Sequence, residues 1–484
     1  MCLPISWLVV LFVSLLIYFT MDLDDIIYLS SLLFSIGFGN IFRKIQNKSN
    51  KRCLATIVGV VIVLIVCGKH TLHPILCTLI NSFIISKCNA RFCHILSFSF
   101  TFAYLLFARC TSYFGFPEVT GHANLVQMIL TLKLVGLAFE VHDSERTKSR
   151  LDDFDDSDAP SAYLETYVIT RPSVADVFHY AFCYIGVLTG PYYKYKTYWD
   201  LFYTRHAEFT PCFEQTIERI KFVPLYMILF SLSTWLFPLR YVGSEEFYRD
   251  SSFLYRVLYA YPCFFSYRMR LYVGFILSEC VCTMAGLGAY PARTQPKPGK
   301  GPTQDFASLV SLAASSDQAK QEVYNFETVN TVNVWKAESD PTVRGSMRYW
   351  NISVQYWLAA YVYHRFPKKS LRLFIVFVVS ALWHGVYSGY YVSLCSVPLY
   401  LPVEDIFVTN FWKKEESRIQ QYCWTSCLFF MKTYQFAYWG TTFQLLRISA
   451  ILKYLISIYF LPYLLTGSMF LLGMYLKNVR VKNH

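Results

Sequence analysis

Residues 53–67 read CLATIVGVVIVLIVC, a run without a charged side chain that directly follows Lys51 and Arg52. A helix needs about 20 predominantly apolar residues to cross the roughly 30 Å hydrocarbon core of a bilayer. The run is close to that length and has no period-two alternation of polar and apolar residues. It therefore predicts a membrane-spanning helix.

Similar runs recur along the whole chain. The 484 residues are 55% hydrophobic and only 16% charged, whereas soluble domains carry about 25% charged residues. The expected spans lie near residues 5–20, 26–42, 53–68, 72–86, 92–108, 124–140, 176–190, 222–239, 254–266, 270–288, 371–387, 389–403, 423–446 and 450–475. Several later segments are short or polar, so we expect an all-α, polytopic transmembrane helical bundle with about ten to twelve spans around an internal cavity. The first run has no preceding Lys or Arg and no small-residue cleavage pattern, which favours a membrane helix over a signal peptide.

The net charge of +12 is divided among short clusters between apolar runs, such as Arg43 to Arg52. By the positive-inside rule this cluster predicts a cytoplasmic loop. Because the positive charge is divided into clusters between apolar runs and forms no continuous basic face, we expect the partner to be a lipid bilayer and not a nucleic acid. The 15 cysteines have no regular spacing, which indicates free thiols. Two histidine or cysteine groupings, at residues 70–73 and 88–94, offer too few ligands to predict a metal site. No motif predicts an oligomeric state.

We expect one domain over residues 1–484, interrupted by two polar segments. Residues 143–162 form an acidic segment with five closely spaced aspartates, which predicts a solvated loop. Residues 291–322 include the Pro- and Gly-rich stretch PKPGKGP at 296–302, which predicts a flexible loop.

His384 lies inside an apolar run, where a titratable side chain is costly unless it faces the bundle interior or a wet cavity. Helical spacing places Ser380, Ala381 and Ser388 on its face, and their small side chains would leave room for a substrate. A functional histidine is one interpretation. A histidine that bonds a neighbouring helix only for packing is the other.

Asn351 lies on a predicted amphipathic helix whose polar stripe is Arg348, Asn351 and Gln355. Asn351-Ile352-Ser353 also matches a glycosylation sequon, which offers a competing explanation. The aromatic, membrane-like surroundings favour a site inside the bundle.

The pair Trp350-Asn351 and Trp383-His384-Gly385, with 33 positions between asparagine and histidine, resembles the signature of the membrane-bound O-acyltransferase family. Further stretches are similar to its lysophosphatidylinositol acyltransferase branch: LTGPYY at 188–193, AGLGAYP at 285–291, YNFET at 324–328 and SGYY at 388–391. The resemblance covers the chain from about residue 117 onward and, more loosely, the helices before it. It departs at Ser388, where relatives often have proline, and over residues 291–322.

The resemblance implies transfer of an acyl group, preferably polyunsaturated and arachidonoyl-like, from acyl-CoA to the sn-2 hydroxyl of a lysophospholipid, first of all lysophosphatidylinositol. It implies a multi-pass protein of the endoplasmic reticulum membrane, with acyl-CoA as co-substrate and no cofactor. His384 would be the general base, and Asn351 would bind the thioester carbonyl or orient the imidazole. The alternatives are other acceptors, such as another lysophospholipid, diacylglycerol or a secreted protein's terminal residue, and, in a different class, a transporter. A transporter predicts repeats that the sequence lacks.

The phosphates of coenzyme A call for cations at the cytoplasmic mouth of the cavity. Candidate contacts are Lys368, Lys369, Arg372 and Arg348, although interfacial anchoring explains the same residues. Two further pairs remain open: Lys194 and Lys196 for an anionic headgroup, and Glu279 with Lys133 as an ion pair within the bundle.

Overall fold

The computed structural model describes residues 21–152, 169–204, 206–306, 308–309, 312, 316–412 and 417–482. Most of this described chain is helical, and its only strands are β1 (Tyr290–Pro291) and β2 (Tyr324–Asn325), which pair antiparallel. The all-α prediction is confirmed. The first expected span, near residues 5–20, lies outside the described residues.

The elements of the amino-terminal half are α2 (Leu23–Arg43), α3 (Lys48–Cys67), η1 (Gly68–Thr71), α4 (Leu72–Lys87), α5 (Ala90–Arg109), η2 (Thr111–Phe114), α6 (Gly121–Asp152), α8 (Val174–Ala181), α9 (Tyr195–Tyr203), η3 (His206–Glu208), α10 (Cys212–Ile220), α11 (Val223–Leu236), α12 (Leu239–Val242) and α13 (Glu245–Asp250). The elements of the carboxyl-terminal half are α14 (Phe253–Ala285), η4 (Ala292–Thr294), α16 (Ser316–Gln321), η5 (Glu327–Val329), α17 (Val334–Ser339), α18 (Val343–Arg348), α19 (Ile352–Leu358), the π-helix η6 (Ala359–Tyr363), η7 (Lys369–Leu371), α20 (Arg372–His384), α21 (Ser388–Asn410), α22 (Arg418–Leu445), α23 (Ile448–Ser457) and α24 (Leu461–Lys482).

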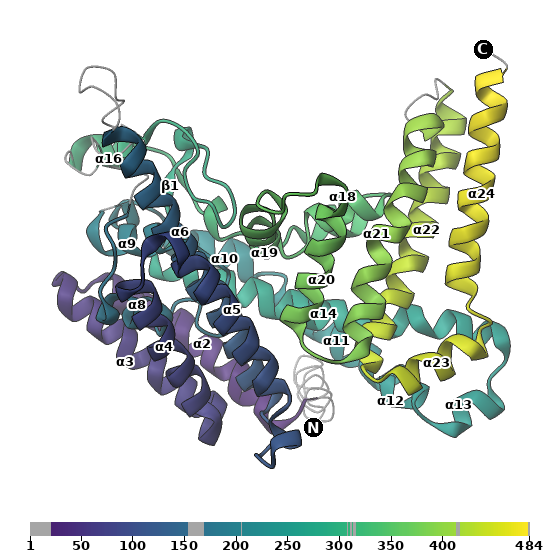
Figure 1. Cartoon of the computed structure of the whole chain (residues 1–484), viewed down its shortest axis with the longest axis horizontal. Helices are drawn as coiled ribbons and strands as arrows, with labels where there is room; N and C mark the ends of the chain where they lie inside the picture. Colours follow the sequence, from purple (N-terminus) through teal and green to yellow (C-terminus); the bar gives the residue numbers. More distant parts are fainter. Residues whose placement is uncertain are drawn as a thin grey trace, which may run out of the picture.

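The first and the last helices of the described chain stand on opposite sides of the molecule (Figure 1). Helices α2 to α6 stand on one side, and α21, α22 and α24 stand on the other. Between them lie α14 and the short elements α18, α19 and α20. The two groups of helices therefore do not form one continuous bundle. The elements at the centre of the molecule connect them.

Six helical stretches among the described residues are long and apolar enough to cross a membrane, or up to seven if the pair α23 and α24, bent by 65°, counts as one span. These six are Leu23–Arg43, Lys48–Lys87, Ala90–Arg109, Gly121–Ser149, Cys212–Val242 and Ser388–Asn410. This count is lower than the ten to twelve expected. Helix α20 has only 13 residues, too short to cross alone, and the long helices α14 and α22 carry charged residues that reduce their apolarity.

The expected spans 254–266 and 270–288 are one continuous helix, α14, of 33 residues. Ser252 caps its amino terminus by accepting from the Tyr255 backbone amide. Gly286, with φ +83°, ends it in the left-handed conformation that suits glycine. Capping signals at both ends, and no break between them, explain why the two predicted spans merge.

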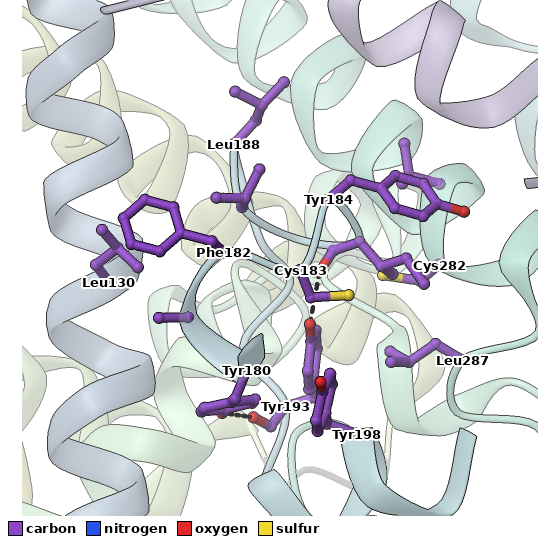
Figure 2. Packing of buried hydrophobic residues seen from close by; sticks show 14 of the residues in the cluster. Leu130, Tyr180, Phe182, Cys183, Tyr184, Leu188, Tyr193, Tyr198, Cys282 and Leu287 are labelled. Carbon is purple, nitrogen blue, oxygen red and sulfur yellow. Dashed lines mark hydrogen bonds between the residues drawn. The ribbon is translucent and has the colours of Figure 1, made fainter. Parts of the chain in front are cut away.

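The expected span 176–190 is also corrected, because α8 ends at Ala181 and irregular, buried backbone follows. Gly186 and Gly190 have positive φ and interrupt any helix. Figure 2 shows side chains of this segment packed with Leu130 of α6 and Cys282 of α14. Non-helical backbone at membrane depth is tolerated where protein encloses it. Here the Tyr193 hydroxyl donates to the Ile185 carbonyl (2.5 Å), one of several internal hydrogen bonds.

Both predicted polar loops differ from expectation in their described parts. Residues 143–152 continue α6, and 153–162 lie outside the described residues. In the segment 291–322, Gly299 and Gly301 have positive φ and build a tight turn, with a bridge between Lys297 and Gly301. The Gly299 amide donates to the Thr328 carbonyl (2.8 Å). The Pro- and Gly-rich sequence at 296–302 thus forms a packed turn.

Candidate active site

A cavity of about 690 Å³ lies where the two halves of the chain meet. Residues from α2, α5, α6, α14, α20, α21 and α22 line it, together with the turn before α19. His384 and Asn351 both face this cavity, although they come from separate elements. The structure therefore brings together the two residues that the sequence singled out as catalytic.

His384 is the last residue of α20 and sits among aromatic rings. Its ring centroid lies 4.9 Å from that of Trp383, 5.6 Å from Tyr390 and 4.9 Å from Phe443. The Trp383 indole donates to the Met128 carbonyl (2.9 Å) and fixes α20 against α6. These contacts hold the imidazole in an apolar, packed wall of the cavity.

Gly385 explains why the helix ends at the histidine. Its φ is +134°, a conformation that side-chain-bearing residues rarely adopt, and a Cβ there would lie 3.3 Å from the Arg109 Nε atom. The chain turns away from the helix axis at this point. As a result Ser388 is not on the face of His384, as helical spacing predicted; its hydroxyl donates to the Leu446 carbonyl (3.1 Å). Ala381 is fully buried, and the cavity lining includes neither of these residues nor Ser380.

Asn351 has left-handed backbone geometry, with φ 47° and ψ 50°. Asparagine tolerates this region better than most residues with a side chain. The predicted continuous amphipathic helix is therefore broken: α18 ends at Arg348 and α19 begins at Ile352. Gln355 does not extend a polar stripe, because its amide donates to the carbonyls of Met347 and Trp350 within the same turn. A place on the cavity wall disfavours glycosylation of Asn351.

Among the residues that the structure describes, no protein group hydrogen-bonds the Asn351 amide or the His384 imidazole. A direct hydrogen bond by which Asn351 orients the imidazole is therefore not formed. Both polar groups face the cavity and are available to a substrate. This arrangement separates His384 from an ordinary packing histidine, which would bond a neighbouring helix.

The predicted coenzyme A contacts lie elsewhere. Lys368, Lys369 and Arg348 are exposed, while the Arg372 guanidinium donates to the Phe366 carbonyl (2.7 Å). None of the four lines the cavity. Helix α20 spans about 20 Å over its 13 residues, so Arg372 and His384 mark its opposite ends.

The basic end of α20 is on the same side of the molecule as the cluster at Arg43 to Arg52. Arg365, just before it, pairs with Asp143 of α6 (2.6 Å), and the neighbouring His142 bonds the Ala90 carbonyl at the start of α5 (3.1 Å). Arg52 near the start of α3 pairs with Asp176, and the nearby Arg171 donates to the Ile85 carbonyl near the end of α4. The start of α5, which follows α4, therefore lies on the same side as the start of α3. The positive-inside rule assigns that side to the cytoplasm.

Cations that do line the cavity are Arg109, Arg268, Arg270 and Lys432. Arg270 pairs with Asp25 (2.7 Å), and His122 contacts the same carboxylate oxygen (3.0 Å). None of these four cations was among the residues predicted from sequence to bind substrate. Their signal was charge within otherwise apolar helices, as in Tyr-Arg-Met-Arg-Leu at 267–271.

Arg268 and Lys432 belong to a second polar group on the cavity wall. Arg268 pairs with Glu338 (2.9 Å), and the Tyr272 hydroxyl donates to the same carboxylate (2.6 Å). Lys432 donates to the carbonyls of Glu338 and Asp340, each at 2.8 Å. Besides Arg109, the apolar cavity thus has two separate charged groups, each internally paired.

The remaining predicted polar contacts take other partners. Lys196 pairs with Asp200 (2.7 Å), and neither it nor Lys194 lines the cavity. The expected pair of Glu279 and Lys133 does not form: Glu279 pairs with Arg219, and Lys133 donates to the Ala181 carbonyl (3.3 Å). Periodicity within one helix does not reveal which helix lies opposite. Across the described residues, no group of three or more His, Cys, Asp or Glu side chains could hold a metal ion.

A model of the membrane-bound O-acyltransferase family matches residues 109–448, which include both Asn351 and His384. The chain belongs to the membrane-bound O-acyltransferase family. Three of its relatives are membrane-bound acylglycerophosphatidylinositol O-acyltransferases. The protein of Drosophila melanogaster is 36% identical over 95% of this chain and 94% of its own length. The Xenopus laevis protein is 38% identical over 94% of each chain, and the Homo sapiens protein 36% identical over 91% of each.

Family membership makes the chain an acyltransferase and places it in a membrane. The match begins at Arg109, so it leaves out α2 to α4, whereas the three relatives match over nearly the whole length. The cavity contains residues from both parts of the chain. The family core supplies Asn351 and His384, and the amino-terminal helices supply Asp25 and Tyr28.

Proposed function

We propose that this acyltransferase moves a fatty acyl group from acyl-CoA to the sn-2 hydroxyl of lysophosphatidylinositol, in the endoplasmic reticulum membrane. The observation that carries the proposal is the shared cavity, where Asn351 and His384 face the interior with no protein partner among the described residues. The names of the three relatives support the phosphatidylinositol acceptor. An arachidonoyl-type chain is the proposed donor preference.

In the proposed mechanism His384 is the general base. An alcohol is a weak nucleophile at neutral pH, so the imidazole takes its proton as the oxygen attacks the thioester carbonyl carbon. The carbon–sulfur bond then breaks, the ester forms, and coenzyme A leaves as its thiol after receiving the proton. Asn351 donates its amide hydrogens to the carbonyl oxygen as negative charge develops there. The missing Asn351–His384 bond favours this role over orientation of the imidazole.

The two ends of the site suit two chemically different substrates. The basic end of α20, Lys368 to Arg372, faces the side assigned to the cytoplasm, where coenzyme A phosphates are available. Arg270, Asp25 and His122 line the cavity at the opposite ends of α2 and α6. A cation beside the cavity favours an anionic lipid headgroup over a zwitterionic one.

A panel assay tests the proposal. Microsomes from cells that express the chain are given labelled arachidonoyl-CoA or oleoyl-CoA with lysophosphatidylinositol, lysophosphatidylcholine, lysophosphatidylethanolamine or lysophosphatidylserine. The expected result is highest transfer to lysophosphatidylinositol from arachidonoyl-CoA. Preference for lysophosphatidylcholine would retain the mechanism and overturn the acceptor. Activity with none of the four acceptors would overturn the proposed function.

A further inference from the structure

Three buried glutamates share one unusual arrangement, in which a helix-borne carboxylate accepts from two successive backbone amides of a distant segment. Glu140 accepts from Tyr195 and Lys196 (2.8 and 3.4 Å). Glu404 of α21 accepts from the amides of residues 343 and 344 (2.6 and 3.0 Å). Glu279 of α14 accepts from residues 331 and 332 (2.5 and 3.1 Å). Each carboxylate thereby fastens a segment to a long helix.

Only the Glu279 segment bonds on both sides of Asn351. The Thr331 carbonyl accepts from the amide of Ile352, the residue after Asn351, at 2.7 Å. The Asn333 amide donates to the carbonyl of Tyr349, two residues before Asn351, at 3.0 Å. Residues 331–333, which we name the strap, therefore hold the turn that contains Asn351.

Glu279 supplies the hydrogen bonds that join the strap to α14, beside the packing of Val332 against Met269 and Tyr272. Glu279 is 3% exposed, and its second carboxylate oxygen accepts from Arg219 of α10. The same Arg219 also donates to the Phe326 carbonyl (3.4 Å), just before the strap. The pair of Glu279 and Arg219 thus bonds both the strap and the residue that precedes it by five positions. Loss of the carboxylate would leave two buried amides without an acceptor.

The geometry points to Glu279 as a positioning residue that acts through the strap to hold Asn351 in the left-handed conformation in which it lines the cavity. This inference rests on the proposed role of Asn351 in acyl transfer. Glu279 itself does not line the cavity, so it touches no substrate. The Asn351 amide interacts with the reacting carbonyl mainly in the transition state. A displacement of this amide should therefore lower kcat more than it weakens substrate binding.

The test compares Glu279→Gln with Glu140→Gln, a matched change at a carboxylate whose segment does not contact Asn351. Both variants and the wild type are purified in detergent, and kcat and KM are measured for each substrate per folded molecule, with folding checked by size-exclusion chromatography. Glu279→Gln should lower kcat about tenfold or more while KM changes by less than about twofold. Glu140→Gln should lower the yield of folded protein but leave kcat per folded molecule close to that of the wild type.

Glu279→Asp provides a second variant if Glu279→Gln does not fold. It keeps the charge opposite Arg219 but is one methylene too short to reach both strap amides, so it should lower kcat at least as much as Glu279→Gln, whose amide oxygen can still accept from them. A kcat within about twofold of wild type in the folded variants, or a rise in KM instead, would overturn the positioning role. A wild-type enzyme that is inactive in the acceptor panel would instead overturn the proposed function, so the two failures are distinguishable.

Discussion

The two ends of α20 carry residues that the sequence marked for different tasks, and their surroundings differ sharply. His384 ends the helix inside the cavity, in contact with three aromatic rings. Lys368 and Lys369 precede its other end and are exposed. A group enclosed by protein has its geometry fixed, whereas an exposed lysine remains solvated and screened. We therefore expect substitutions near His384 to change the kinetic constants most, and substitutions at Lys368 and Lys369 to change them least.

Loss of the base should have the largest effect. His384→Ala removes the only group assigned to accept the hydroxyl proton, so kcat should fall about 10²- to 10⁴-fold with little loss of folded protein. Acyl transfer from labelled acyl-CoA to lysophosphatidylinositol measures it. His364→Ala, at an exposed histidine of the same region, is the control and should behave as wild type. Similar activity of the two variants would remove the catalytic role of His384.

Asn351 should come next, and two substitutions separate its side chain from its backbone. Asn351→Ala removes the amide and disfavours the left-handed conformation, whereas Asn351→Gly removes the amide but adopts that conformation readily. If the amide stabilises the developing oxyanion, both should lose about 10²- to 10³-fold in kcat. Steady-state kinetics on folded enzyme distinguish the cases. Near-normal kcat in Asn351→Gly would show that the position serves only the shape of the turn.

Arg270 should affect affinity and acceptor choice more than chemistry. Arg270→Gln leaves Asp25 its contact with His122 and removes a cation from the cavity wall. KM for lysophosphatidylinositol should rise about tenfold, equivalent to roughly 1.4 kcal/mol, with a smaller change for lysophosphatidylcholine. Arg249→Gln, at an exposed arginine outside the cavity, is the matched control. An equal rise of KM for both acceptors would argue against recognition of headgroup charge.

The lysine end of α20 should give the smallest effect. The double change Lys368→Ala and Lys369→Ala should raise KM for acyl-CoA about threefold at low ionic strength and leave kcat unchanged, because exposed charges are screened by salt. The difference should disappear at high salt. Lys221→Ala changes an exposed lysine that pairs with Glu218 and serves as the control. An unchanged KM at low salt would assign these lysines to interfacial anchoring alone.

The differences between sequence-based expectation and structure have specific physical causes. The position of His384 within an apolar run marked it as unusual, and helix periodicity placed Ser388 on its face. That second prediction is wrong because the turn at Gly385 depends on a φ that periodicity ignores. Proline and glycine content predicted flexibility around Gly299, where contacts with a distant segment instead fix a tight turn. The four cavity cations were missed because their role depends on which helices meet.

The sequence alone determined that this is an all-helical membrane protein, because long uncharged runs can satisfy their backbone groups in lipid only as helices. The motifs that contain Asn351 and His384, with the spacing between them, also identified the family. Only the tertiary structure decided that these residues share one cavity, that Arg270 lines it while Arg372 does not, and that Glu279 fastens the strap beside Asn351. Those facts depend on contacts between segments far apart in the chain, and local sequence patterns carry no information about which segments meet.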